Sequence, residues 1–495
     1  MWFLNKVEFF FLVVKLLIMS EEAKKSKLEE KLALKPKSCW EVWDKKTIDK
    51  VFAFAEDYKD FLGKAKTERL AVYEIRKLAE KEGFVEWGKF SKKADCFRAG
   101  DKVYLVNRNK TIILAVKGKR AVGDGLRFIL AHIDSPRLDL KLRPLYEDTQ
   151  LAFLKTHYYG GIKKYQWPAL PLAMHGVIVL RSGRKIEINV GDDPRDPIFM
   201  IGDLLPHLAK KQLEKKLKEA IGAEELNLVV GSIPLIAEKV AKEKVKLNIL
   251  NLLNREYGIK EEDFVSADLE IVPAGRARDL GWDRSMVAGY GQDDRVCSYA
   301  AVRALFGVKR PEFTSVVILT DKEETGSRSN TGMTSRFWTD FVRKMLFVET
   351  GEESEIGLRD ALAASEAISA DVTAAFNPDH KDVYDPRNQA KMGFGLAVEK
   401  YTGHRGKYST NEAHAEYMAK IRRVLSEARV PWQPAQLGKV DVGGGGTVAM
   451  FLAEYGMDVL DAGVALLNMH APFEIASKAD IYAAYLGYRA FLFAS

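Results

Sequence analysis

Several short motifs place histidine or carboxylate side chains at or near the ends of apolar runs. His132 ends the run that begins at Leu126, and His470 ends the run 466–469. The carboxylate candidates are Glu323 and Glu324, which follow the run 316–320, Asp371, which lies within an apolar stretch, and Asp293, which precedes a predicted helix. Imidazole nitrogens and carboxylate oxygens together form a ligand set suited to zinc, cobalt or manganese. These residue types therefore suggest a metal site.

Each motif also has an explanation without metal chemistry. His132 could cap a strand beside a solvated Asp134. Asp293 could stabilise the first turn of a helix, because a carboxylate there accepts main-chain N–H groups and opposes the helix dipole. The acidic pair at 323–324 could form an exposed turn. Asp371 lies in an apolar stretch, where a buried acid needs a cation or hydrogen bonds.

The elements that must position these residues alternate between strands and helices. Residues 126–131 and 316–320 are apolar runs typical of buried strands, whereas 295–306 and 51–81 have apolar residues at helical spacing. This alternation predicts an α/β fold, a three-layer α/β/α domain with a mixed sheet. Because such sheets bind ligands at the carboxyl ends of their strands, the shared placement of the candidates favours one common site.

The middle of the chain has a different sequence pattern. Residues 177–180 and 186–190 predict a β-hairpin, and lysine-rich helices follow. We therefore expect an inserted β-rich domain over 141–272 that divides the catalytic domain into 19–140 and 273–495. Residues 1–18 are apolar but carry charges, so we expect a misassigned start or a disordered extension, with a weak amphipathic anchor or targeting segment as the alternative.

Composition excludes several classes of protein. The 76 basic and 69 acidic residues give a net charge of only +7, and no basic stripe with interleaved aromatics suggests nucleic-acid binding. The apolar N-terminal run is interrupted by charges, so we expect no membrane span. The three cysteines are far apart in the chain, which argues against a disulfide framework and favours a reducing, cytoplasmic location.

Taken in order, the motifs resemble the aspartyl aminopeptidase and vacuolar aminopeptidase I family of metallopeptidases. Further landmarks of that family are Tyr159-Gly160-Gly161, residues 205–209, residues 443–447 and Glu474. The resemblance runs from about residue 35 to the end of the chain. It implies a metal-dependent aminopeptidase that removes N-terminal residues from peptides.

The resemblance also assigns roles to the candidate residues. It implies two divalent ions, zinc or alternatively cobalt or manganese, with His132, Asp293 and Asp371 on one and Asp293, Glu324 and His470 on the other. Glu323 would be the general base that takes a proton from the metal-bridging water. Asp134 would orient His132. In relatives the inserted domain mediates dimerisation, and dimers assemble into a homododecamer.

Two more residues are assigned to substrate binding by the resemblance. His207 matches a histidine that reaches the active site of a neighbouring subunit, although a packed helix histidine is the alternative. Lys407 matches a basic position near the substrate pocket, although an exposed lysine is the alternative. After Tyr159-Gly160-Gly161 the chain departs from the family pattern, so a preference for acidic N-terminal residues does not follow.

Two other functions are compatible with the residues. A related dimetal hydrolase of the same fold could remove acyl groups from acylated amino acids. Alternatively, the chain could be a non-catalytic assembly protein. The intact set of candidate ligands argues against the second alternative.

Overall fold

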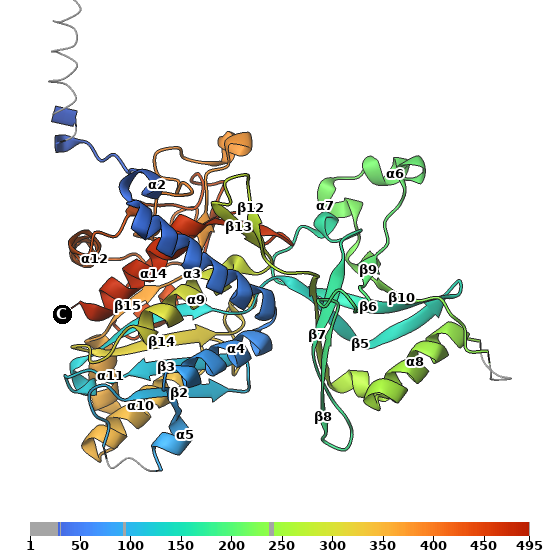
Figure 1. Cartoon of the computed structure of the whole chain (residues 1–495), viewed down its shortest axis with the longest axis horizontal. Coiled ribbons are helices and arrows are strands. Elements are labelled where there is room, and N and C mark those ends of the chain that lie inside the picture. Colours follow the sequence, from blue (N-terminus) through green and yellow to red (C-terminus); the bar gives the residue numbers. More distant parts are fainter. Residues whose placement is uncertain (1–27, 30, 93–95, 237–241, 495) are drawn as a thin grey trace, which may run out of the picture.

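The computed structural model describes residues 28–494 except for residue 30, residues 93–95 and residues 237–241 (Figure 1). The expectation for residues 1–18 lies outside this part of the chain. Two sheet-based units lie side by side in Figure 1. The larger unit combines N-terminal and C-terminal segments, and the smaller one is formed by residues 137–273.

The larger unit contains a nine-stranded mixed sheet, so the prediction of a mixed sheet is confirmed. Its four central strands are parallel to one another, and antiparallel pairs flank them on both sides. In spatial order the strands are β1 (Val85–Glu86), β2 (Lys102–Asn107), β3 (Thr111–Val116), β14 (Thr314–Thr320), β4 (Leu126–His132), β15 (Glu366–Ser369), β21 (Asp458–Gly463), β17 (Leu396–Glu399) and β19 (Trp432–Pro434).

Helices cover both faces of this sheet and produce three layers. Alternate residues of β4 serve the two cores: Ile129 and Ala131 pack on one side, Phe128 and Leu130 on the other. The helices on the first side are α3 (Lys45–Lys64), α4 (Glu68–Lys81), α9 (Gln292–Phe306), α12 (Ala415–Glu427) and α14 (Lys478–Phe493). Those on the second are α5 (Trp87–Phe90), α10 (Phe337–Thr350), α11 (Glu355–Ala363) and α13 (Ala449–Ala453).

The predicted helix over 51–81 is two helices, α3 and α4. The break falls at residues 65–67. Thr67 has an extended backbone, and its side-chain oxygen accepts a hydrogen bond from the N–H of Leu70. This N-cap starts a new helix, which a periodic apolar pattern alone does not reveal. Near the N-terminus of the described chain lies the short helix α2 (Cys39–Val42).

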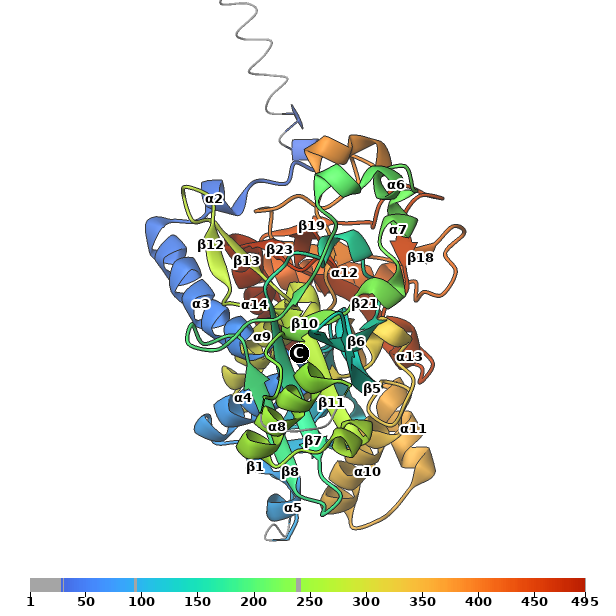
Figure 2. The same ribbon diagram turned by 90° about the vertical axis from the view of Figure 1, so that its right-hand side faces the viewer.

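The smaller unit is a seven-stranded antiparallel sheet with helix α8 (Lys244–Tyr257) packed against it. Figure 2 looks at the molecule from the side of this unit. The predicted hairpin is present, with Ile178 opposite Ile186. In spatial order the strands are β8 (Lys185–Val190), β7 (Leu172–Val179), β11 (Ala267–Pro273), β5 (Arg137–Asp148), β6 (Leu151–Tyr159), β10 (Leu228–Gly231) and β9 (Met200–Ile201), and two one-turn helices, α6 (Lys210–Leu213) and α7 (Leu217–Ala220), precede β10.

A third, five-stranded sheet lies beside the carboxyl ends of the central strands. Its strands β13 and β22 lead into the segments that carry Asp293 and His470. In spatial order it contains β12 (Arg278–Leu280), β13 (Met286–Gly289), β23 (Glu474–Ser477), β22 (Ala465–Leu467) and β16 (Thr373–Ala374). A two-stranded ribbon pairs β18 (Gly403–His404) with β20 (Gly444–Gly445).

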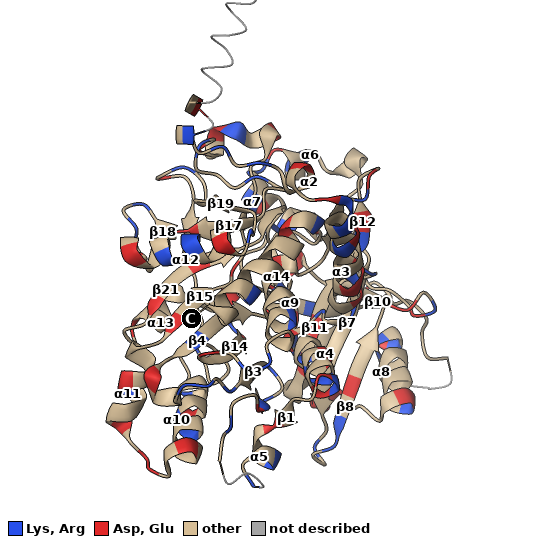
Figure 3. Cartoon of the chain, turned by 60° about the vertical axis from the view of Figure 1, so that its left-hand side comes forward, with Lys and Arg blue, Asp and Glu red and all other residues tan. Residues whose placement is uncertain are grey.

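Charged residues of both signs are interspersed over the two units (Figure 3). Within the part of the chain that the structure describes, no helix combines the length and the apolar character needed to cross a bilayer.

A buried ionic cluster joins the two units. Glu68, at the start of α4, is fully buried, and its carboxylate lies 3.4 Å from a guanidinium nitrogen of Arg137 on β5. The Nε atom of Arg137 also lies 3.4 Å from the carboxylate of Glu270 on β11. Lys110 adds a second cation 2.9 Å from Glu68. Because these charges are shielded from water, each depends on its partners.

Replacement of Arg137 by Met is therefore expected to destabilise the fold by about 3–5 kcal/mol, since it leaves two buried carboxylates short of a cation. The change would be measured from the midpoint of urea unfolding. Lys119→Met is the control, because Lys119 is well exposed and lies 3.6 Å from Glu312 in a surface pair, which contributes less than about 1 kcal/mol. Equal losses in the two variants would contradict the assignment.

Candidate metal centre

Parallel strands bring four of the candidate residues to one edge of the large sheet. His132 ends β4, and its register partner on β14 is Thr320. Three residues beyond Thr320 begins a short 3-10 turn, Glu323–Thr325, which carries the acidic pair. Strand β15 lies on the other side of β4 and ends at Ser369, two residues before Asp371. The placement at strand ends predicted from sequence thus holds for these residues.

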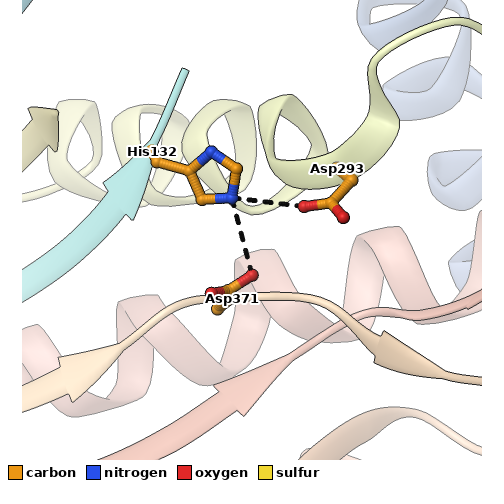
Figure 4. A group of neighbouring side chains, drawn as sticks. All are labelled: His132, Asp293 and Asp371. Carbon is orange, nitrogen blue, oxygen red and sulfur yellow. Dashed lines mark ion pairs between the residues drawn. The ribbon is translucent and has the colours of Figure 1, made fainter. Parts of the chain in front are cut away.

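His132, Asp293 and Asp371 form one compact group (Figure 4). The Nε2 atom of His132 lies 3.2 Å from Oδ1 of Asp293 and 3.7 Å from Oδ1 of Asp371. The carboxylate of Asp293 comes from the start of α9, where the backbone of Asp293 is not yet helical. All three side chains are largely buried, so the group is held away from bulk water.

A second group shares Asp293 with the first. The Nε2 atom of His470 lies 3.2 Å from Oδ2 of Asp293 and 3.5 Å from Oε1 of Glu324. Asp293 therefore presents one oxygen to each histidine. Oε1 of Glu324 is buried and has no hydrogen-bond partner among the described residues. Such an orphaned oxygen is expected at a position where a cation binds.

The two imidazole rings are oriented by main-chain carbonyls. Nδ1 of His132 lies 3.0 Å from the carbonyl oxygen of Asp134, and Nδ1 of His470 lies 2.9 Å from that of Gly161. In each case an Nδ1–H that donates to the carbonyl leaves the Nε2 lone pair facing the carboxylates. This is the tautomer that binds a metal through Nε2.

Asp134 was predicted to orient His132, but it also contacts the turn of the acidic pair and Tyr159. Its side-chain oxygens accept hydrogen bonds from the N–H groups of Glu323 and Glu324, both at 3.2 Å, and from the hydroxyl of Tyr159 at 2.6 Å. Oδ1 also lies 3.4 Å from Nδ1 of His132. One buried carboxylate thus connects the turn that carries the acidic pair to the end of β4.

The end of β6 and the two glycines after it reach this site from the smaller unit, which the sequence motifs did not predict. Tyr159 contacts Asp134, and Gly161 contacts His470, as described above. A Cβ atom on Gly160 would lie 3.2 Å from the side chain of Glu324, and the φ of Gly160 is +70°. A side chain at this position would be both strained and crowded. In the sequence, Gly160 and Gly161 indicate that the backbone can approach another group closely at this point.

The charges of the cluster are unbalanced without a cation. Burial, reinforced by the carboxylates of Asp371 and Asp134, raises the pKa of Glu323 to about 8, although His132 opposes the shift. Burial and the charge of Asp293 likewise raise the pKa of Glu324. Burial lowers the pKa of His470, but its contacts with Asp293 and Glu324 outweigh this and raise it to about 10. Protons thus supply the positive charge that metal ions would supply, so the residues fit a metal centre.

The other two candidates lie apart from this cluster. His207 is exposed in the 3-10 turn Pro206–Leu208, and no described contact joins it to the carboxylates. The ammonium of Lys407 lies 2.8 Å from a carboxylate oxygen of Glu412 and 4.0 Å from the ring centroid of Tyr401. Lys407 lines a cavity of about 320 Å³ together with Arg405 and Lys439. Neither residue contributes to the metal centre of its own chain.

Comparison with known proteins identifies the family. The family model described as aminopeptidase I zinc metalloprotease (M18) matches residues 61–492. The chain belongs to the M18 family of aminopeptidases. It is 53% identical over 456 residues to a Clostridium acetobutylicum protein named "Probable M18 family aminopeptidase 1", covering 92% of this chain and 98% of the relative. It is 50% identical over 458 residues to the protein of that name from Thermotoga maritima, covering 91% and 98% of the two chains.

Solved structures agree with this membership. The crystal structure of the M18 aminopeptidase from Thermotoga maritima matches with a TM-score of 0.89 at 49% identity, covering 93% of this chain and 99% of that chain. The dodecamer structure of mApe1 from S. cerevisiae matches with a TM-score of 0.69 at 20% identity, covering 88% and 95% of the two chains, and shows a shared fold. The M18 chain described here is a metal-dependent aminopeptidase of a zinc metalloprotease family, a hydrolase that acts on peptides.

Proposed function

We propose that this M18 aminopeptidase binds two zinc ions and uses Glu323 as its general base. His132, Asp293 and Asp371 would hold one ion, and Asp293, Glu324 and His470 the other. The observation that carries the proposal is the shared carboxylate of Asp293, whose two oxygens each lie 3.2 Å from a different histidine. Asp134 would orient His132 and the turn of the acidic pair.

When bound, the two ions would supply Lewis acidity and positive charge that lower the pKa of the attacking water and polarise the scissile carbonyl. Glu323 would then take a proton from that water and deliver it to the leaving amine. The position of Glu323 supports this role, because its carboxylate lies 4.0 Å from Nε2 of His132 at the edge of the cluster.

The substrate would be a peptide with a free amino terminus. A deacylase of acylated amino acids and a non-catalytic assembly protein are the alternatives compatible with the sequence. Membership of the M18 family favours the aminopeptidase over both. Lys407 would contact the substrate from the cavity near β18, although its ion pair with Glu412 would first have to open.

We also propose that the chain assembles from dimers into a homododecamer, with dimerisation through the smaller unit. The dodecameric S. cerevisiae relative of the same fold supports this proposal. The exposed position of His207 on the smaller unit suits a contact with the active site of a neighbouring subunit.

The three cysteines are free thiols. Because a reducing compartment keeps thiols free, we propose a cytoplasmic location, which cell fractionation would test.

Replacement of Glu323 by Gln is expected to lower kcat by about 10²–10⁴-fold, because the amide cannot accept the proton of the attacking water. The zinc content should remain two ions per chain, as measured by elemental analysis of the purified enzyme. Chelation should abolish the activity of the unsubstituted enzyme, and added zinc should restore it. Full activity of the Gln variant with both ions bound would exclude Glu323 as the base.

The control for this variant is Glu312→Gln at the surface pair with Lys119, which should leave kcat unchanged. The same assays with an N-acetylated peptide separate the aminopeptidase from the deacylase. Removal of the acetyl group would support the deacylase, whereas an aminopeptidase leaves the blocked peptide intact.

Replacement of Lys407 by Met is expected to lower kcat/KM by about tenfold for a substrate with an N-terminal Asp, if the ammonium pairs with the acidic side chain in a partly exposed site. A substrate with an N-terminal Leu should be cleaved at the original rate, since no ion pair is lost. Lys439→Met, on the same cavity, is the matched control. An equal fall in kcat/KM for both substrates would show that Lys407 does not recognise the side chain of the N-terminal residue.

Light scattering of the purified enzyme is expected to give the mass of twelve chains.

Replacement of His207 by Ala should lower kcat without releasing zinc. If His207 acts on a neighbouring subunit, co-expression of His207→Ala and Glu323→Gln chains should yield assemblies more active than either variant alone. In such assemblies an intact base meets an intact histidine across an interface. If the mixed assemblies recover no activity, His207 acts only within its own chain or has a structural role.

A further inference from the structure

A buried carboxylate lies directly behind the second candidate group. Glu474 is the first residue of β23, and only 1% of its surface is exposed. Its Oε1 atom accepts a hydrogen bond from the N–H of His470 at 2.8 Å. Its Oε2 atom accepts one from the N–H of Asp293 at 3.1 Å. One side chain therefore connects the backbones of two residues that belong to the same group.

The main chain around Glu474 is fixed independently of its carboxylate. Glu474 pairs with Gly289 at the end of the antiparallel ladder between β13 and β23. The side-chain amide of Gln292 donates hydrogen bonds to the carbonyl oxygens of Glu474, at 2.7 Å, and Val287, at 3.1 Å. The backbone that carries the carboxylate is therefore held rigidly, as a positioning role requires.

The carboxylate of Glu474 has an unusual set of partners. Among the described residues, no lysine, arginine or histidine side chain forms an ion pair with it. Its hydrogen-bond donors there are the two main-chain N–H groups. A carboxylate buried without a cation is costly. That cost is reduced if metal ions bind to Asp293 and His470, because their charge then lies one residue away.

We propose that Glu474 is a positioning residue that sets the spacing between Asp293 and His470 and so maintains the binding of the second ion. This inference rests on the two-ion function proposed above. The dependence should be selective for that ion. His132 belongs to the hydrogen-bonded ladder of β4, whereas His470 lies in a turn beyond β22 with a φ of +65°. This left-handed conformation is disfavoured for histidine and needs external support.

The test is the replacement of Glu474 by Gln. The amide is nearly the same size, but its NH2 group faces one of the two N–H donors, so one of the two hydrogen bonds is lost. Zinc binding to the metal-free enzyme would be measured by titration calorimetry. We expect the two zinc equivalents to respond unequally: one should lose about 10–100-fold in affinity and the other should change little. Saturating zinc should restore kcat in the variant.

A matched control exists elsewhere in the chain. Asp480 is fully buried, and its two oxygens accept hydrogen bonds from the N–H groups of Gly393 and Gly395, both at 2.7 Å. Asp480→Asn therefore makes the same chemical change to the same kind of carboxylate away from the candidate centre. It should lower thermal stability without changing either zinc affinity. If Glu474→Gln does not fold, Glu474→Asp retains the charge but reaches only one N–H, and the same selective loss is expected.

Three results would overturn the inference: unchanged affinity for both ions in the Glu474 variants, an equal loss of both ions, or the same loss in Asp480→Asn. Binding of fewer than two ions by the unsubstituted enzyme would instead overturn the proposed two-ion function. The two failures are distinguished by the first titration, before any variant is compared.

Discussion

The structure is organised around the burial of negative charge at one edge of the large sheet. The carboxylates of Asp293, Glu324 and Asp371 have little access to water and converge on two imidazoles. Burial of like charges at this density is unfavourable unless a cation or protons neutralise them. The raised pKa values of Glu324, Asp371 and His470 reflect that constraint in the metal-free chain. Much of the surrounding architecture serves to hold these side chains together despite their repulsion.

Main-chain amides provide much of the support. Asp134 accepts the N–H groups of Glu323 and Glu324, and Glu474 accepts those of Asp293 and His470. The two carboxylates have parallel roles, because each accepts two main-chain N–H groups. The donors to Asp134 are neighbours in one turn, whereas the donors to Glu474 come from different elements. A carboxylate suits this task because its two oxygens can each accept a separate donor. Consequently the candidate ligands are fixed at their backbones before any ion is bound.

Sequence patterns were sufficient to predict part of this arrangement. The apolar runs before His132 and Glu323 indicated buried strands, and the α/β alternation indicated a mixed sheet with helices on both faces. The N-cap that divides α3 from α4 was missed, because the apolar period continues across it. The contact of Gly161 with His470 joins residues 309 positions apart in the chain. No local pattern encodes such a contact, and only the assembled topology reveals it. The boundaries of the smaller unit, 137–273, differ by a few residues from the expected 141–272, because strands β5 and β11 extend into the junction.

The smaller unit cannot be regarded as a separate appendage, because its contacts form a continuous path to the candidate centre. The guanidinium of Arg137, held by Glu68 and Glu270 at the junction, lies 4.0 Å from the ring centroid of Tyr159. The hydroxyl of Tyr159 donates to Asp134, and two residues later the carbonyl of Gly161 orients His470. A shift between the two units would therefore move the carbonyl of Gly161, which orients His470, and the hydroxyl of Tyr159, which contacts Asp134. The buried ionic junction thus has a functional consequence as well as a structural one: it fixes the unit whose loop orients one of the two candidate histidines.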